Sequence, residues 1–81
     1  LYSDELHSDI ARVLHNLGTL YGSQGVELLK RSLAIKRKVY HNEPHLEIAL
    51  TLNNLGAATS DPTEAATYYE EALSIYREVY R

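Results

Sequence analysis

The sequence repeats itself, and this repeat constrains the fold more than any other feature. When residues 1–18 are aligned with residues 39–56, nine of 18 positions are identical. The identical pairs are Tyr2/Tyr40, Glu5/Glu43, His7/His45, Ile10/Ile48, Ala11/Ala49, Leu14/Leu52, Asn16/Asn54, Leu17/Leu55 and Gly18/Gly56. Self-similarity at a period of about 20–50 residues is typical of solenoids, whose units bury their apolar faces against their neighbours. We therefore expect two stacked copies of one supersecondary unit, which present a surface and carry out no chemistry.

The length of the chain sets the number of units. Its 81 residues form at most one small domain, and two units fall below the three or so that a repeat stack normally needs. Both ends also fall at the same point of the repeat. We expect residues 1–81 to be a single segment of a longer array, with unit one at approximately 3–41 and unit two at approximately 42–81.

Composition narrows the class of protein. Cysteine is absent, which excludes disulfides, thiolate metal sites and cysteine nucleophiles. No apolar run is long enough for a membrane span and no signal-peptide pattern occurs, so we expect an intracellular, cytoplasmic protein. The formal charge of −3 is unevenly divided. Residues 1–43 hold six Lys/Arg and five Asp/Glu, whereas residues 44–81 hold two and six, an asymmetry that favours a fixed stacking order.

Apolar residues recur at steps of three and four, which indicates helices over approximately 8–22, 26–40, 45–59 and 62–80. Gly22–Gly25 and His41–Pro44 separate these helices, and Asp61 with Pro62 forms a strong helix start. No alternating stretch indicates a strand, so the fold class is all-α. The expected core consists of Leu14, Leu17, Leu33, Leu52, Leu55, Tyr69 and Leu73.

Glycine occupies the same place within the first helix of each unit. Gly18 and Gly56 each lower helix stability by about 1 kcal/mol relative to alanine. Since both units tolerate this loss, we expect a close helix crossing there.

The repeated residues resemble a known family. His45–Ala49, Leu52–Gly56 and Ala65–Tyr80, with their counterparts in the first unit, resemble the tetratricopeptide repeat of the long variety found in kinesin light chains. The resemblance implies a TPR-type α-solenoid, in which two helix–turn–helix units form part of a right-handed superhelix. The first helix of each pair would line a concave groove and the second would form the outer wall.

The chain departs from the family between the helices of each pair. It is a few residues shorter around Gly25-Val26 and around Ser60-Asp61. Either both turns are tightened, or loop residues are missing at both places. We favour missing residues because both losses fall at the same loop.

Residues of the first and third helices that turn away from the packing face are the candidate binding site. They are Arg12, His15, Asn16, Thr19, Leu50, Asn53, Asn54 and Ala57. In the family, such residues bind extended peptides, and an Asn amide offers both a donor and an acceptor to a peptide backbone. The alternative is that Asn16 and Asn54 bond across to the next unit or are simply exposed.

Other clusters have simpler interpretations. The basic residues of 30–38 favour a solvated outer face paired with acids such as Glu71, rather than a nucleic-acid or phospholipid site, because no aromatic platform accompanies them. His41 and His45 are separated by Pro44 and belong to the connector rather than to a metal pair. The seven tyrosines are expected in packing, not around a cofactor. No constellation predicts catalysis, a cofactor or a metal.

Three functions remain open. The leading hypothesis is a protein–protein interaction scaffold that binds a peptide or partner segment in its groove. The second is a structural spacer or self-assembling module whose apolar end faces, at Leu1-Tyr2 and at Tyr76, Val79 and Tyr80, stack on further copies. The third is a regulatory array attached to another domain.

Overall fold

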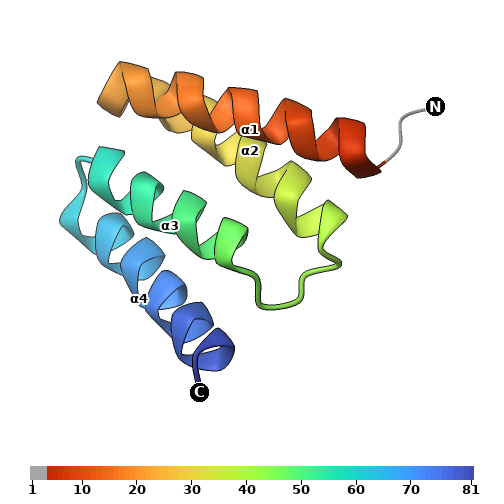
Figure 1. Ribbon diagram of the computed structural model, residues 1–81. Coiled ribbons are helices and arrows are strands. Elements are labelled where there is room, and N and C mark those ends of the chain that lie inside the picture. Colours follow the sequence, from red (N-terminus) through yellow and green to blue (C-terminus); the bar gives the residue numbers. More distant parts are fainter. Residues whose placement is uncertain (1–3) are drawn as a thin grey trace.

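The computed structural model describes residues 4–81, and their side chains from residue 9 onward. Its helices are α1 (Asp4–Tyr21), α2 (Val26–Val39), α3 (Leu46–Ala58) and α4 (Pro62–Val79), with a short 3₁₀ turn, η1 (Gly22–Gly25), between the first two. Within residues 4–81 there is no strand, so the all-α prediction is confirmed. Figure 1 shows two antiparallel hairpins, α1 with α2 and α3 with α4, stacked so that α2 lies against α3. Leu1 and Tyr2, expected to meet another copy, lie outside the described residues.

The helix boundaries follow from local signals in the sequence. Helix α1 begins earlier than the predicted residue 8, and the other boundaries agree to within one residue. Helix α4 begins as expected, because the Asp61 side chain accepts a hydrogen bond from the Thr63 amide at 3.0 Å and Pro62 occupies the first turn.

The connector between the hairpins is closely held. His41 and Asn42 take positive φ angles of 55° and 60°, which end α2. The His45 ring then caps α3 by accepting from the Glu47 amide at 3.0 Å, and it stacks on Tyr40 at 3.6 Å between ring centroids. This geometry supports the connector role predicted for His45.

A close backbone contact closes the first hairpin. A Cβ atom added to Gly25 would lie 2.6 Å from the Gly18 Cα atom, and one added to Gly18 would lie 2.6 Å from Leu29 Cγ. Together with the 3₁₀ turn, this contact absorbs the shortening, so the packing faces of α1 and α2 still meet. The first hairpin therefore has a tightened turn, and the absence of loop residues from the sequence stays a prediction. In the second hairpin, a Cβ on Gly56 would meet the Tyr69 ring at 2.8 Å, which confirms the predicted close crossings.

The core differs from the expected one, and the burial predicted for three residues is wrong. Leu14, Leu52 and Leu55 are buried and Leu33 is partly buried. Leu17, Tyr69 and Leu73, however, are 38 %, 42 % and 49 % exposed. They are left partly exposed because α4 packs along α3 alone and α1 along α2 and the edge of α3, although the Tyr69 ring lies against Gly56 of α3. In their place the structure buries Leu29 and several small or polar side chains, namely Ala11, Ser32, Lys36, Ala49, Thr51 and Ala72.

The turn contact makes a testable prediction. Gly25→Ala should lower the free energy of unfolding by about 1–3 kcal/mol, because the new methyl group meets backbone that cannot move aside. The matched control is Gly22→Asn in the same turn. Gly22 has a φ of 60° and open space around its Cα atom, and asparagine tolerates this conformation. Urea unfolding of both variants is the measurement, and equal stabilities would contradict the contact.

Candidate functional site: the groove and the junction beneath it

The two hairpins meet at a partly buried polar cluster, which we call the junction and define as His15, Lys36, Glu47, Thr51 and Asn54. The Lys36 side chain is 4 % exposed. Its Nζ atom lies 2.8 Å from Thr51 Oγ1, 3.2 Å from a carboxylate oxygen of Glu47 and 3.4 Å from the Glu47 carbonyl oxygen. A buried ammonium is stable only when such partners replace its water, so α2 and α3 are held together at this point.

His15 adds α1 to the junction. Its side chain is buried, with 8 % of the residue exposed. Nδ1 lies 3.0 Å from Thr51 Oγ1 and Nε2 lies 2.8 Å from Asn54 Nδ2. Burial, and then the nearby Lys36 charge, lower the pKa of His15, while Glu47 opposes that shift. Burial also lowers the pKa of Lys36, against the effect of Glu47.

The helix faces explain why these side chains converge. Leu29, Ser32 and Lys36 follow each other at steps of three and four on the buried face of α2. Ser32 donates to the Ala11 carbonyl oxygen at 2.7 Å and so ties α2 to α1. Lys36 continues the same face toward α3, where Thr51 shares the buried face with Leu52.

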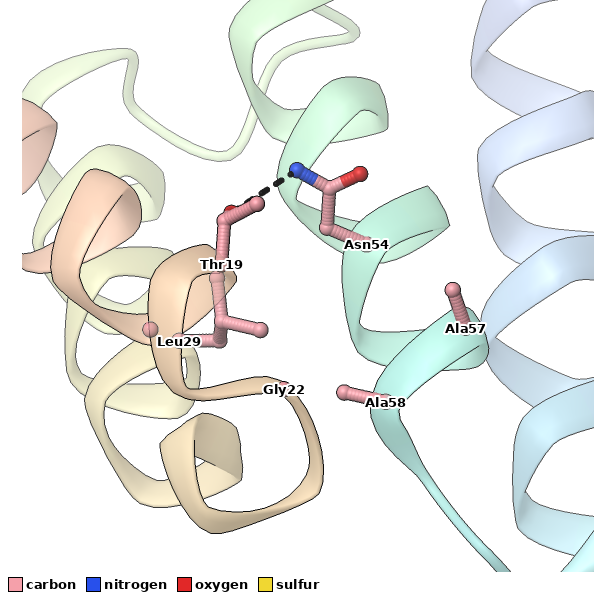
Figure 2. Close-up of a pocket in the computed structure, with 7 residues that line it drawn as sticks. Thr19, Gly22, Leu29, Asn54, Ala57 and Ala58 are labelled. Carbon is pink, nitrogen blue, oxygen red and sulfur yellow. Dashed lines mark hydrogen bonds between the residues drawn. The ribbon is translucent and has the colours of Figure 1, made fainter.

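Above the junction lies a small pocket between the C-terminal ends of α1 and α3. Its volume is about 130 Å³, and its lining residues are Gly18, Thr19, Gly22, Leu29, Asn54, Ala57 and Ala58. Figure 2 shows the Asn54 amide nitrogen directed toward Thr19 across the pocket, at a hydrogen-bond distance of 3.3 Å. Three of the predicted site residues, Thr19, Asn54 and Ala57, therefore come together from two different hairpins.

The other predicted site residues do not line the pocket. Arg12 is exposed and pairs with Asp9 at 3.0 Å, while Asn16, Leu50 and Asn53 are exposed on the same two helices. His15 is buried, and both of its ring nitrogens lie within hydrogen-bond distance of other side chains. For Asn54, the alternative of a bond across to the other unit is the one observed.

The junction was not predicted from the sequence, because Lys36 was expected on the solvated basic face. That prediction is wrong for Lys36, although Arg37 does pair with Glu71 at 2.7 Å as the outer-face interpretation expects. A signal was present in the departures from the repeat. Thr51 stands where the first unit has the apolar Val13, and it is polar at a core position.

The protonation state of His15 predicts how stability changes with pH. Because its pKa is lowered in the folded chain, the unfolded chain binds more protons below about pH 6.5, so stability falls as pH decreases from there to the lowered pKa. Urea unfolding between pH 7.5 and 5 measures this slope. His15→Gln should reduce the slope relative to the unmodified chain. Equal slopes in the variant and the unmodified chain would contradict a neutral, buried His15.

Comparison with known proteins agrees with the repeat and the fold. A family model described as tetratricopeptide repeat matches residues 9–78, which covers both hairpins and every predicted site residue. Neither the curated proteins nor the solved structures include a match to this sequence. The paired antiparallel helices, their repeated crossings and the family model lead to one conclusion: the chain belongs to the tetratricopeptide repeat family.

Proposed function

We propose that this protein is an interaction scaffold that holds an extended segment of a partner protein in the groove between α1 and α3. The observation that carries the proposal is the pocket lined by Thr19, Asn54 and Ala57, which exists only when both hairpins are stacked. Tetratricopeptide repeats generally mediate protein–protein interactions. Exposed Arg12, Asn16, Leu50 and Asn53 extend the same surface along the two helices, and they offer a charge, amide groups and an apolar contact to a ligand.

Several finer points belong to the same proposal. We assign the chain to the long-repeat, kinesin-light-chain-like variety, on the residues quoted above, and regard residues 1–81 as one segment of a longer intracellular array, with units at about 3–41 and 42–81. A regulatory role beside another domain is compatible with this arrangement. Among residues 4–81, none of the helices combines the length and hydrophobicity that a membrane crossing needs.

We also propose a function without catalysis and without nucleic acid. Within the described residues, no group of three His, Asp or Glu side chains gathers around a potential metal position. The basic residues of α2 are partly consumed by protein contacts. Lys36 is buried, Lys30 lies 3.7 Å from Glu27, and Arg37 pairs with Glu71, which leaves a weaker positive surface than the composition of this helix indicates.

A peptide-display selection tests whether the groove binds peptides. Arg12→Ala combined with Asn53→Ala should reduce enrichment of peptides selected on the unmodified chain, because both side chains are exposed on the two helices that line the groove. Far-ultraviolet circular dichroism should remain unchanged. The matched control is Thr67→Ala with Glu70→Ala, two exposed positions on α4 away from the groove. Equal enrichment by the two double variants would contradict a binding surface on α1 and α3.

One observation favours self-association as a second function. Leu33 of α2 packs against the core of the next hairpin, whereas its repeat counterpart Leu73 on α4 is 49 % exposed. Val79 and Tyr80 are exposed nearby, and α1 exposes Val13 at the opposite end of the stack. A second copy stacked head to tail would cover both faces, and its more basic first unit would meet the acidic second unit.

Sedimentation across a concentration series tests the second function. We expect the weight-average mass to rise with concentration, because apolar faces of this kind are rarely left uncovered. Leu73→Glu should shift association to higher concentration, since a charge would enter the contact. Thr67→Glu is the control, as Thr67 is exposed on the same helix. A weight-average mass equal to that of the monomer at every concentration would contradict head-to-tail stacking.

A further inference from the structure

Two ionisable side chains of the first hairpin, His15 and Lys36, lie side by side beneath α3. Lys36 Nζ is 3.3 Å from His15 Nδ1, and the two residues are only 4 % and 8 % exposed. Thr51 of α3 contacts both, with its Oγ1 atom 3.0 Å from Nδ1 and 2.8 Å from Nζ. A change of charge on either side chain therefore acts directly on the contact between the two hairpins.

The position of His15 suits a neutral ring. Two donors face its nitrogens, Lys36 Nζ at Nδ1 and Asn54 Nδ2 at Nε2, the latter at 2.8 Å. Whichever nitrogen carries the hydrogen of a neutral imidazole, the other one is an acceptor, whereas an imidazolium has no acceptor at all. A second ring proton would leave neither donor with an acceptor in the ring, and it would place a positive charge next to the Lys36 ammonium.

The junction has one negative charge to balance these groups. Among the residues that the structure describes, the charged groups that act on His15 are Lys36 from α2 and Glu47 from α3, and the Glu47 carboxylate already lies 3.2 Å from Lys36 Nζ. On α1 itself, Arg12 is one turn away and pairs with Asp9. The other polar neighbours from α3 are neutral, η1 has no ionisable side chain, and α4 packs against α3 rather than α1. Protonated His15 would therefore give this cluster a net positive charge, which is unfavourable until water reaches it.

Water reaches the pair most readily if α3 moves away from the first hairpin. Helices α1 and α2 are joined by the close backbone approach of Gly18 and Gly25, whereas α1 meets α3 only along its edge. Near the connector, Arg37 of α2 pairs with Glu71 of α4 at 2.7 Å, and this pair does not include His15. We therefore expect the hairpins to separate most at the end of the stack that lies away from the connector.

We propose that the stack of the two hairpins is a pH-sensitive switch, in which a second proton on the His15 ring makes α3 and α4 move away from α1 and α2 while each hairpin keeps its helices. This inference goes beyond the proposed function and does not depend on it. The pocket above the junction is lined by residues of both hairpins, so it exists only in the stacked form.

Proton linkage gives the direction and the size of the response. In the stacked form, burial and then Lys36 lower the pKa of His15, against the effect of Glu47. When α3 moves away, the ring regains water and its pKa returns toward the ordinary value of about 6.5. The separated form then binds more protons below about pH 6.5. The ratio of separated to stacked molecules should rise by up to about tenfold per pH unit until the lowered pKa is reached.

The distance between two spin labels measures the separation. Because the sequence has no cysteine, Ser23→Cys in η1 and Ser60→Cys between α3 and α4 place one label on each hairpin, both at exposed positions. The labelled chain is diluted with unlabelled chain, so that contacts between copies do not contribute. Pulsed electron paramagnetic resonance should give one distance at pH 7.5 and a second, longer distance that gains population between pH 6.5 and 5. Far-ultraviolet circular dichroism should keep its helical signal over the same range.

Three variants assign the response to the junction. With His15→Gln, whose side chain does not titrate, only the short distance should remain at pH 5. Lys36→Met removes the neighbouring charge and should have the same effect, and it provides the test on its own if circular dichroism shows His15→Gln to be unfolded. The matched control is His45→Asn, because asparagine also caps a helix and the pH response should persist.

Each contrary outcome overturns the proposal for a different reason. A single short distance down to pH 5 would show that the hairpins stay stacked. A longer distance that appears together with loss of the helical signal would show that the whole chain unfolds. A longer distance that persists in His15→Gln and in Lys36→Met would assign the response to other groups. No ligand takes part in these measurements, so none of these outcomes bears on the groove as a binding site.

Discussion

The buried ammonium of Lys36 is the interaction on which the arrangement of the two hairpins depends. It lies where α2 meets α3, and His15 brings α1 to the same point. Burial of a charge is unfavourable unless each of its hydrogen bonds is replaced. The relative position of the hairpins is therefore constrained more tightly than apolar contact alone would require. A shift of α3 along α2 would leave the Lys36 charge without Thr51 and Glu47.

The junction also explains how two stacked hairpins present a defined pocket on their shared surface. The hairpins use equivalent internal contacts, Gly18 on Leu29 and Gly56 on Tyr69, so each is built in the same way. The two hairpins differ in the side chains that each presents to the other. The first unit contributes His15 and Lys36, the second contributes Thr51 and Asn54, and the pocket above them is shared between the two.

Much of the fold could be predicted from the sequence because its signals are local. Apolar periodicity, the Asp61-Pro62 start and the glycines determine helices and turns within a few neighbouring residues. Burial could not be predicted as well, because it depends on which face of a helix has a neighbour. Leu73 repeats the pattern of the packed Leu33 but lies on a helix face that nothing covers.

The candidate site was only partly predictable for a related reason. Thr19, Asn54 and Ala57 were found from their helical positions, since the groove face follows from the repeat. The burial of His15 and Lys36 depends on hydrogen bonds between residues 11 to 39 positions apart in the chain, and no local pattern encodes such partners. A polar residue at a core position, as Thr51 is, was the one available indication.

The junction joins the two hairpins into one cooperative structure, and native-state amide hydrogen exchange tests this role most directly. In the unmodified chain, the slowest amides of α1 and α3 should exchange through one shared opening, with equal free energy and equal denaturant dependence. Thr51→Val removes the hydroxyl between Lys36 and His15 at nearly constant shape, and it should separate the openings of the two hairpins. Separate openings already present in the unmodified chain, or a shared opening that survives Thr51→Val, would contradict the account.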